Sequence, residues 1–192
     1  MKHDFDQIIS RKQTHSTKWL KFSNPEVIPM WIADMDFVWP PEILRALSER
    51  VNQGIFGYTD TPSSLTDIFI ERVKENFDWT INKDWIVWIP GGVVGLNIAC
   101  KTVLAPGEIA MVPSPVYPPF TEAPENMERG FVKTHLNDYK GRLEFDMEAV
   151  KTLLTDDCKL FFLCNPQNPG GTVFNKEELN EIAEICKEKN II

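Results

Sequence analysis

Short apolar segments alternate with helical patterns from residue 84 to the end of the chain, and this alternation constrains the fold more than any other feature. Four runs are short and apolar enough to be strands, at residues 85–90, 108–115, 130–136 and 158–164. Helical patterns occupy residues 91–104, 146–154 and 175–190, and a broken helix is indicated at 116–127. Strands that alternate with helices form a parallel sheet covered on both faces. The sequence therefore predicts an α/β fold with three αβα layers and a mainly parallel sheet.

Several helices carry recognisable start signals. Asn175 precedes the last helix, and Glu178 follows three residues later, which is the spacing of a capping box. Nearer the N-terminus, Pro41 suits the first turn of a helix over residues 42–53, because the missing N–H of proline has no acceptor at that position in any case. Pro62 opens a second helix in the same way. The residues before these helices show no regular pattern.

The overall composition is that of an ordinary globular protein. Of the 192 residues, 43% are hydrophobic and 25% are charged, and the formal net charge is −8. An acidic chain without a run of Lys and Arg argues against a nucleic-acid surface. No stretch approaches the roughly 20 apolar residues that a membrane span needs, and the charged N-terminus does not resemble a signal peptide.

The cysteines and histidines do not form a recognisable metal motif. No Cys-x-x-Cys pair occurs, and the three histidines are far apart in the sequence, so a zinc site has little support. Reduced thiols in the cytoplasm are the simplest interpretation of the four scattered cysteines, Cys100, Cys158, Cys164 and Cys186.

Ligands of open parallel sheets bind beyond the carboxyl ends of the strands, and one such end leads straight into a helix. Gly91 and Gly92 would let a ligand approach the backbone, and the N–H groups of Gly92, Val93 and Val94 would point out of the helix start. Free N–H groups at a helix N-terminus suit a phosphate. A plain turn that needs glycines for tight packing explains the same residues, and both interpretations stay open. The spacing matches neither a Walker loop nor a dinucleotide fingerprint.

Two further strand ends present an aromatic ring and an amide. Tyr117 lies between Pro115 and Pro118, which restrict the backbone and aim the ring. It is either a platform for a flat ligand or an ordinary loop tyrosine. Asn168 follows the strand at 158–164 and precedes a proline, so its amide is either offered to a planar ligand or used within its own turn. A phosphate seat, a stacking ring and an amide donor together suit pyridoxal phosphate best.

The chain also resembles a known family, the fold-type-I pyridoxal-phosphate enzymes of the aminotransferase class I/II superfamily. The closer resemblance is to the cystathionine β-lyases (C–S lyases) of the MalY/PatB type. It rests on PMWIADMDF, FGYTD, GGVVG, PVYPPF and NPQNPGG, which are spread across nearly the whole chain. The resemblance implies an N-terminal arm and small-domain segment at residues 1–45. It implies the first part of a large cofactor-binding domain at 46–192, with the rest of that domain and a C-terminal small domain absent.

The family's cofactor contacts transfer to matching positions. The resemblance implies that Asn168 hydrogen-bonds the pyridine oxygen, that Tyr117 stacks on the pyridine, and that the backbone of Gly92, Val93 and Val94 holds the phosphate. One position departs from the pattern. The family usually has Thr or Ser before the last glycine of NPQNPGG, where this chain has Gly170.

Three other positions concern the substrate and a second subunit. Tyr58 matches a tyrosine that reaches the phosphate of the neighbouring subunit's cofactor, which implies a homodimer with shared active sites. The segment at 31–37 matches the substrate side of the site and includes Trp31 and Ala33. A small sulfur-containing amino acid is the substrate that the resemblance implies.

The activity that the resemblance implies is β-elimination from cystathionine-like amino acids, which releases a thiol, pyruvate and ammonia. The alternatives are an aminotransferase and, from a different class, a non-catalytic domain that binds a ligand or a partner. The family's Schiff-base lysine, its pyridine-binding aspartate and its substrate arginine all match no residue here and are expected beyond Ile192. Because residues 190–192 look like the start of a further strand, we expect an N-terminal part of a longer enzyme that is inactive alone.

Overall fold

The computed structural model describes residues 4–192. By its internal contacts the chain divides into two compact units, Met1–Thr66 and Asp67–Ile192. The expected boundary after residue 45, between an arm and a cofactor-binding domain, concerns a longer protein and stays a prediction.

The first unit contains little regular structure. Its helices are α1 (Thr17–Leu20) and α2 (Pro41–Asn52), and α3 (Ser63–Phe77) begins at its end. The helix predicted over 42–53 is confirmed as α2, with proline at its first position. The chain leaves this helix through Gly54, whose φ of +68° is a left-handed conformation that glycine adopts at little cost.

A four-stranded sheet lies at the centre of the second unit. Its strands are β1 (Ile109–Ser114), β2 (Gly130–Tyr139), β3 (Arg142–Phe145) and β4 (Cys158–Phe161), in the order β3-β2-β1-β4. β1 is parallel to both β2 and β4, whereas β2 and β3 form an antiparallel hairpin. The mainly parallel sheet is therefore confirmed.

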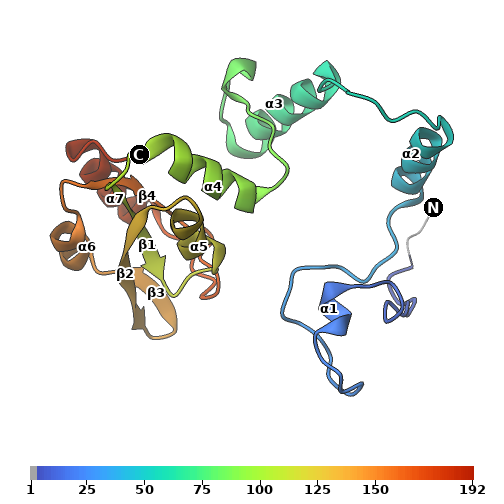
Figure 1. Cartoon of the computed structure of the whole chain (residues 1–192), viewed down its shortest axis with the longest axis horizontal. Helices are drawn as coiled ribbons and strands as arrows, with labels where there is room; N and C mark the ends of the chain where they lie inside the picture. Colours follow the sequence, from blue (N-terminus) through green and yellow to red (C-terminus); the bar gives the residue numbers. More distant parts are fainter. Residues whose placement is uncertain (1–3) are drawn as a thin grey trace. The chain divides into compact units, whose positions relative to one another are not determined.

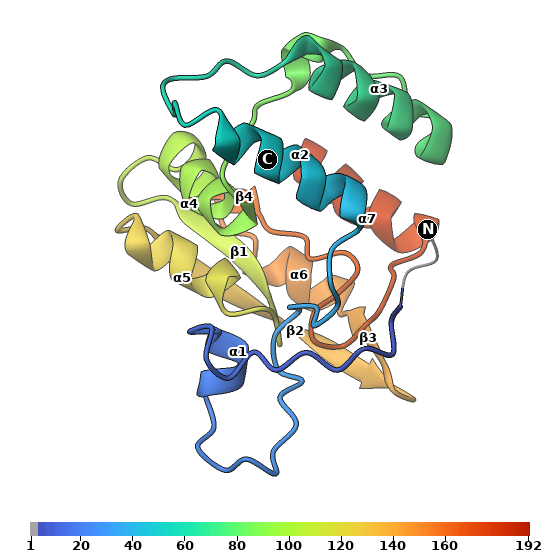
Figure 2. The same cartoon turned by 90° about the vertical axis from the view of Figure 1, so that its right-hand side faces the viewer.

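Helices cover both faces of this sheet, as Figures 1 and 2 show. The helices of the unit after α3 are α4 (Gly92–Val103), α5 (Pro119–Asn126), α6 (Met147–Leu153) and α7 (Lys176–Glu188), with a 3₁₀ turn η1 at Lys83–Trp85. One core packs α4 and α5 against Ala110, Val112 and Leu160. The other packs α6 and α7 against Met111 and Phe161. Because successive residues of a strand point to opposite faces, Val112 and Met111 serve different cores, and the three layers are confirmed.

The start of α7 forms as the sequence predicts. Asn175 accepts a hydrogen bond from the Glu178 backbone N–H, and the Glu178 carboxylate accepts one from the Asn175 N–H. Arg142 from β3 donates two hydrogen bonds to the same carboxylate, at 2.8 and 2.6 Å. The pKa of Glu178 is lowered, first by the Arg142 hydrogen bond. The helix cap and the hairpin are thus joined by one bidentate pair.

The structure corrects two predicted strands and adds one strand that was not predicted. Residues 85–90 are not a strand, because no strand within residues 4–192 pairs with them, and Val87 is left 79% exposed. The strand predicted at 130–136 is longer, since β2 continues to Tyr139 and the chain reverses at Lys140–Gly141, where both residues have positive φ. β3 had no apolar alternation long enough to predict it.

The end of the chain lies against β4. The Ile192 N–H donates to the Lys159 carbonyl, and the Ile192 carbonyl accepts from the Phe161 N–H at 2.7 Å. Two bonds that bracket Leu160 in this way are the pattern of a parallel strand pair. Ile191 is buried in the core beside α6 and α7.

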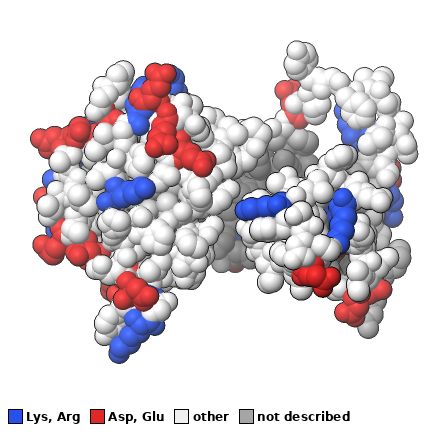
Figure 3. All heavy atoms as spheres, turned by 60° about the horizontal axis from the view of Figure 1, so that its bottom comes forward, with Lys and Arg blue, Asp and Glu red and all other residues white. Residues whose placement is uncertain are grey.

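The surface carries charges of both signs. On the face shown in Figure 3, Lys and Arg side chains are scattered among Asp, Glu and uncharged residues and do not gather into one basic patch. No helix within residues 4–192 is both long and apolar enough to cross a membrane.

Candidate functional site

Two of the predicted site segments meet at one edge of the sheet. β1 and β4 are parallel neighbours, so their carboxyl ends point the same way. β1 leads into the loop that carries Tyr117, and β4 leads into the turn at 165–171 that carries Asn168. The peptide bonds Ser114–Pro115, Asn165–Pro166 and Asn168–Pro169 are all cis. The parallel pairing of two strands therefore brings together residues that are 51 positions apart.

The N-terminus of α4 has the properties of an anion site. Gly91 is its N-cap, with φ +122° and ψ +157°, and the first helical hydrogen bond runs from the Gly95 N–H to the Gly91 carbonyl. The N–H groups of Gly92, Val93 and Val94 precede that bond and have no intrahelical acceptor. A Cβ added at Gly91 or Gly92 would meet no atom within 4 Å, so the space in front of them is open.

This open space bears on why the glycines occur here. Tight packing explains Gly95, where a Cβ would lie 2.6 Å from the Ile89 Cδ1. It does not explain Gly91, which needs its positive φ, or Gly92, which has room for a side chain. Packing therefore does not account for Gly91 or Gly92, and a phosphate at this helix start stays a prediction.

Tyr117 is presented at the start of α5. The residue is 44% exposed, and the backbone on either side is restricted by Pro115 and by Pro118, the N-cap of α5. The Tyr117 carbonyl accepts a hydrogen bond from the Phe120 N–H at 3.0 Å. A ring on a restrained backbone with an exposed surface is suited to stacking on a flat ligand.

The two asparagines of the 165–171 turn are used differently. The side-chain oxygen of Asn165 accepts a hydrogen bond from the Phe174 N–H at 3.2 Å and so closes the turn. No hydrogen bond among residues 4–192 uses the side-chain amide of Asn168, which is exposed. Satisfaction of its own turn, the alternative explanation of Asn168, is therefore not what the structure shows. Its amide is available to a ligand.

The start of α4, Tyr117 and Asn168 are not all joined by direct contacts. No hydrogen bond among residues 4–192 connects the first turn of α4 with Tyr117 or Asn168. α4 is instead held against α5, where the Asn126 amide donates to the Asn97 side-chain oxygen at 3.2 Å. Since α5 follows Tyr117 directly, the start of α4 is connected to Tyr117 only indirectly, through the packing of α4 on α5.

Sequence analysis missed the residue between the two asparagines. Gln167 is only 2% exposed, and its side-chain amide forms hydrogen bonds to both the Tyr117 loop and its own turn. A glutamine enclosed by two Asn-Pro pairs was the available signal, because a polar side chain in so rigid a setting must find partners within it.

Ala33 and its neighbours line a pocket in the first unit. The pocket has a volume of about 470 Å³, and its lining also includes Met35, Phe37 and Trp39. Trp31 is held nearby in the chain, because its indole N–H donates to the Lys18 carbonyl at 3.3 Å and the Lys21 ammonium lies 3.9 Å from its ring centroid. The predicted substrate-side segment is therefore a partly apolar surface.

A group of charges holds the same segment in place. The Asp36 carboxylate accepts hydrogen bonds from Lys18 at 2.6 Å, from the Trp19 indole at 2.7 Å and from Arg11 at 2.9 Å. The Lys18 hydrogen bond is the largest cause that lowers the pKa of Asp36 to about 2. Arg11 also pairs with Asp34 at 2.8 Å. Residues 31–37 are thus tied to the start of the chain by ionic contacts.

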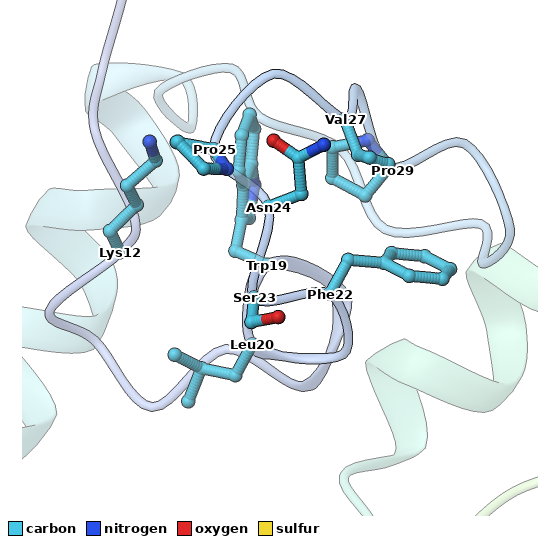
Figure 4. Close-up of a pocket in the computed structure, with 9 residues that line it drawn as sticks. All are labelled: Lys12, Trp19, Leu20, Phe22, Ser23, Asn24, Pro25, Val27 and Pro29. Atoms are coloured by element: carbon cyan, nitrogen blue, oxygen red, sulfur yellow. The ribbon is translucent and has the colours of Figure 1, made fainter.

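Tyr58 and a second pocket lie in the first unit, and neither is part of the pocket that Ala33 lines. Tyr58 is fully exposed in the loop between α2 and α3. A second pocket, of about 280 Å³, is shown in Figure 4. Apart from Lys12, its lining comes from α1 and the loop after it, and none of the predicted site residues is among them.

A comparison with known protein families decides the family. The model of the family "Aminotransferase class I and II" matches residues 25–192. The chain belongs to this family. The match includes the α4 start, the Tyr117 loop and the 165–171 turn, all of which lie in the second unit.

Individual relatives narrow the similarity within the family. The chain is 36% identical to "Cystathionine beta-lyase PatB" of Bacillus subtilis, over 98% of this chain and 50% of that protein. It is 27% identical to "Protein MalY" of Escherichia coli, over 98% of this chain and 50% of that protein. The chain thus spans about half the length of the curated relatives that it matches.

Solved structures agree with the sequence relatives. Cystalysin from Treponema denticola, a structure with a pyridoxal 5′-phosphate cofactor, superposes with a TM-score of 0.91 at 30% identity. The match covers 100% of this chain and 50% of that one. The pyridoxal-phosphate-bound C–S lyase of Staphylococcus hominis superposes equally well, with a TM-score of 0.91 at 31% identity, over 100% of this chain and 50% of that one.

Proposed function

We propose that this chain forms the N-terminal part of a pyridoxal-phosphate-dependent C–S β-lyase that acts on cystathionine-like amino acids. The observation that carries the proposal is at the sheet edge. There the Asn168 amide, which forms no hydrogen bond among residues 4–192, and the ring of Tyr117, an exposed residue, follow the neighbouring strands β4 and β1. Relatives that match 98% and 95% of the chain bear the name cystathionine β-lyase, which supports the same substrate class.

The residues present fit this cofactor. Asn168 would donate its unused amide to the ring oxygen, Tyr117 would stack on the ring, and the N–H groups of Gly92, Val93 and Val94 would hold the phosphate. The open space at Gly91 and Gly92 leaves room for that phosphate. When bound, pyridoxal phosphate withdraws electrons from the α-carbon of an amino acid. The protein's task at this edge is to orient the ring for that chemistry.

Among residues 4–192, no lysine lies in a small-residue loop after a core strand, where the proposed chemistry would need it. Lys101 lies within α4 and Lys159 within β4, while Lys18 is paired with Asp36 in the first unit. In the proposed longer enzyme, the lysine that moves the α-proton, the aspartate at the pyridine nitrogen and the substrate arginine come from residues beyond Ile192. We accordingly propose that these 192 residues bind the cofactor without turning over substrate.

The substrate side and the assembly are parts of the same proposal. The segment with Trp31 and Ala33 would contact the amino-acid substrate, and Ala33 lines an existing pocket. Tyr58 would reach the cofactor phosphate of a second subunit, which its full exposure permits, so the enzyme would be a homodimer. All four cysteines are free, in keeping with a cytoplasmic protein.

An aminotransferase is the second candidate within the family. The putative aminotransferase YugH of Bacillus subtilis is 30% identical over 86% of this chain and 44% of that protein, which lies within the range of identities of the lyases. Both reactions would use the same Tyr117 and Asn168. A non-catalytic ligand-binding domain is the alternative of another class.

Product analysis of the longer enzyme separates these functions. We expect pyruvate and ammonia from cystathionine without any keto acid, in amounts that exceed the enzyme many times over. Turnover that requires a keto acid would replace the lyase proposal with the aminotransferase. Absence of any turnover by a longer protein that binds pyridoxal phosphate would favour the binding domain.

The chain itself tests the cofactor part of the proposal. Titration with pyridoxal phosphate is expected to show saturable binding that weakens in Asn168→Ala and Tyr117→Ala. Borohydride treatment followed by mass spectrometry is expected to add no cofactor mass to one specific lysine. A single stoichiometrically labelled lysine would contradict the prediction of an inactive chain.

A further inference from the structure

Gln167 is a buried polar side chain at the centre of the 165–171 turn. It is 2% exposed and lies between the two cis Asn–Pro bonds. A primary amide has two donor hydrogens and an acceptor oxygen, and burial requires that these find partners. The partners of the Gln167 side-chain amide therefore show which segments this residue connects.

The side-chain amide bridges two separate segments. Its nitrogen donates to the Pro115 carbonyl at 2.5 Å, in the loop that carries Tyr117, and to the Asn168 carbonyl at 3.3 Å. Its oxygen accepts a hydrogen bond from the Gly170 N–H at 2.5 Å. One end of the amide thus contacts the loop after β1, and the other contacts the turn after β4.

The backbone of Gln167 is fixed as well. Its N–H donates to the Thr172 carbonyl at 2.7 Å, and its carbonyl accepts from the Gly171 N–H at 2.7 Å. The Thr172 hydroxyl in turn accepts a hydrogen bond from the Leu143 N–H in β3 at 3.0 Å. The amide therefore projects from a turn that is itself anchored to the sheet.

The glutamine and Leu143 together explain Gly170. A Cβ at this position would lie 2.6 Å from the Gln167 side-chain oxygen and would also collide with Leu143. The backbone of Gly170 does not have a positive φ, so space and not conformation requires glycine here. The Leu143 side chain and the Gln167 oxygen together fill the space that a side chain at this position would need.

We propose that Gln167 is a positioning residue that sets the spacing between Tyr117 and Asn168, with Gly170 as the space that its amide needs. The meaning of this spacing for a ring ligand rests on the proposed function, whereas the bridge itself does not. Glutamine is suited to the task because it donates in one direction and accepts in the other. Glutamate has the same length but cannot donate to the Pro115 carbonyl. Methionine has a similar length but can neither donate to that carbonyl nor accept from the Gly170 N–H as an amide oxygen does.

The bridge can be tested without any cofactor, because the chain has only three tyrosines, Tyr58, Tyr117 and Tyr139. Incorporation of 3-fluorotyrosine gives three ¹⁹F resonances, and Tyr117→Phe identifies the one of interest. We expect Gln167→Met to shift or broaden the Tyr117 resonance and to leave the other two unchanged. Gln13→Met, the same replacement at an exposed glutamine, serves as the control. An unchanged Tyr117 resonance in folded Gln167→Met would overturn the proposal.

Two measurements keep the test decisive if Gln167→Met does not fold. Gln167→Glu retains the acceptor for the Gly170 N–H but cannot donate to the Pro115 and Asn168 carbonyls, so the same Tyr117 change is expected. In the unaltered chain, the side-chain amide hydrogens of Gln167 are expected to exchange with water far more slowly than those of Gln13. Equal exchange rates would refute the bridge without any substitution.

Cofactor titration distinguishes this inference from the proposed function. If both hold, Gln167→Met weakens pyridoxal-phosphate binding by roughly tenfold, the size of one lost buried hydrogen bond, and Gln167→Glu also weakens it. If the unaltered chain binds no pyridoxal phosphate but the Tyr117 resonance responds as expected, only the proposed function fails. Unaltered affinity together with an unmoved Tyr117 resonance in Gln167→Met would reject the positioning role alone.

Discussion

The turn at 165–171 and the segment at 31–37 are both irregular backbone with proposed ligand contacts, but they are held by different chemistry. The turn is organised by a buried neutral amide, Gln167, and by backbone hydrogen bonds to the sheet. The segment is held by partly exposed ion pairs from Arg11 and Lys18 to Asp36. A buried neutral network depends on shape and complete hydrogen bonding, whereas exposed ion pairs depend on pH and salt.

The difference suits what each region is proposed to contact. A cofactor ring that stays bound benefits from a rigid edge, and the turn meets this need without any titratable group of its own. A substrate enters and leaves, so its contact segment can be held by weaker surface pairs. The comparison predicts that substitutions at the turn act through packing and that those at the segment act through charge.

The largest effect is expected from Gly170→Ala. The added methyl group would overlap the Gln167 oxygen and Leu143, so we expect a loss of about 1–3 kcal/mol in the free energy of unfolding. Gly92→Ala is the matched control, because its methyl group enters open space in a helix and should be neutral or stabilising. Urea denaturation followed by circular dichroism measures both. Equal stabilities for the two variants would contradict the packed turn.

A pair of buried threonines, Thr172 after the turn and Thr134 in β2, tests hydrogen bonding in the second unit. Thr172→Val removes the acceptor of the Leu143 N–H and should cost about 1 kcal/mol. Thr134→Val removes a buried hydroxyl that has no hydrogen-bond partner, so the protein should be unchanged or up to about 1 kcal/mol more stable. Opposite signs in the same denaturation experiment would support the hydrogen-bond assignment, and a stabilising Thr172→Val would refute it.

The two asparagines should separate stability from binding. Asn165→Ala removes the acceptor of the Phe174 N–H and should lower stability by roughly 0.5–1.5 kcal/mol. Asn168→Ala should leave stability within about 0.5 kcal/mol, as expected for an exposed residue without such a bond. Only Asn168→Ala should weaken pyridoxal-phosphate binding in proportion to a lost ligand contact. A stability loss in Asn168→Ala that matches Asn165→Ala would show that its amide serves the turn.

The smallest effect concerns pH and should be confined to the 31–37 segment. The pKa of Asp36 is about 2 in the folded chain, against an ordinary value of 3.8, because Lys18 first and then Trp19 donate to its carboxylate. A lowered pKa stabilises the fold above the ordinary value, and this contribution disappears as the pH falls from about 4 to about 2.

The Trp19 indole N–H reports directly on this titration because it donates to Asp36 at 2.7 Å. We expect its proton resonance to move with a midpoint near pH 2 and to lose this transition in Asp36→Asn. A midpoint close to 3.8 would show that the ion pairs do not hold the segment. The Tyr117 resonance should not follow the same midpoint.

Much of the fold was predictable because it depends on local patterns. The helix caps at Asn175 and the proline start of α2 need only neighbouring residues, and both formed as expected. Residues 85–90 have the composition of a strand, but a strand exists only where another strand pairs with it. β3 shows the reverse, since four weakly patterned residues, Arg142–Phe145, become a strand because β2 turns back beside them.

The sequence by itself determined the α/β architecture, the family resemblance and the polar or aromatic residues at the strand ends, because composition and spacing along the chain are local properties. Only the tertiary structure decided which of these residues are free to act. It assigned Asn165 to the turn and left the Asn168 amide unused, and it placed Gln167 between two segments 52 residues apart. The Gln167 bridge depends on two parallel strands lying side by side, and the Asn165 bond depends on how its turn folds back, and spacing along the chain specifies neither.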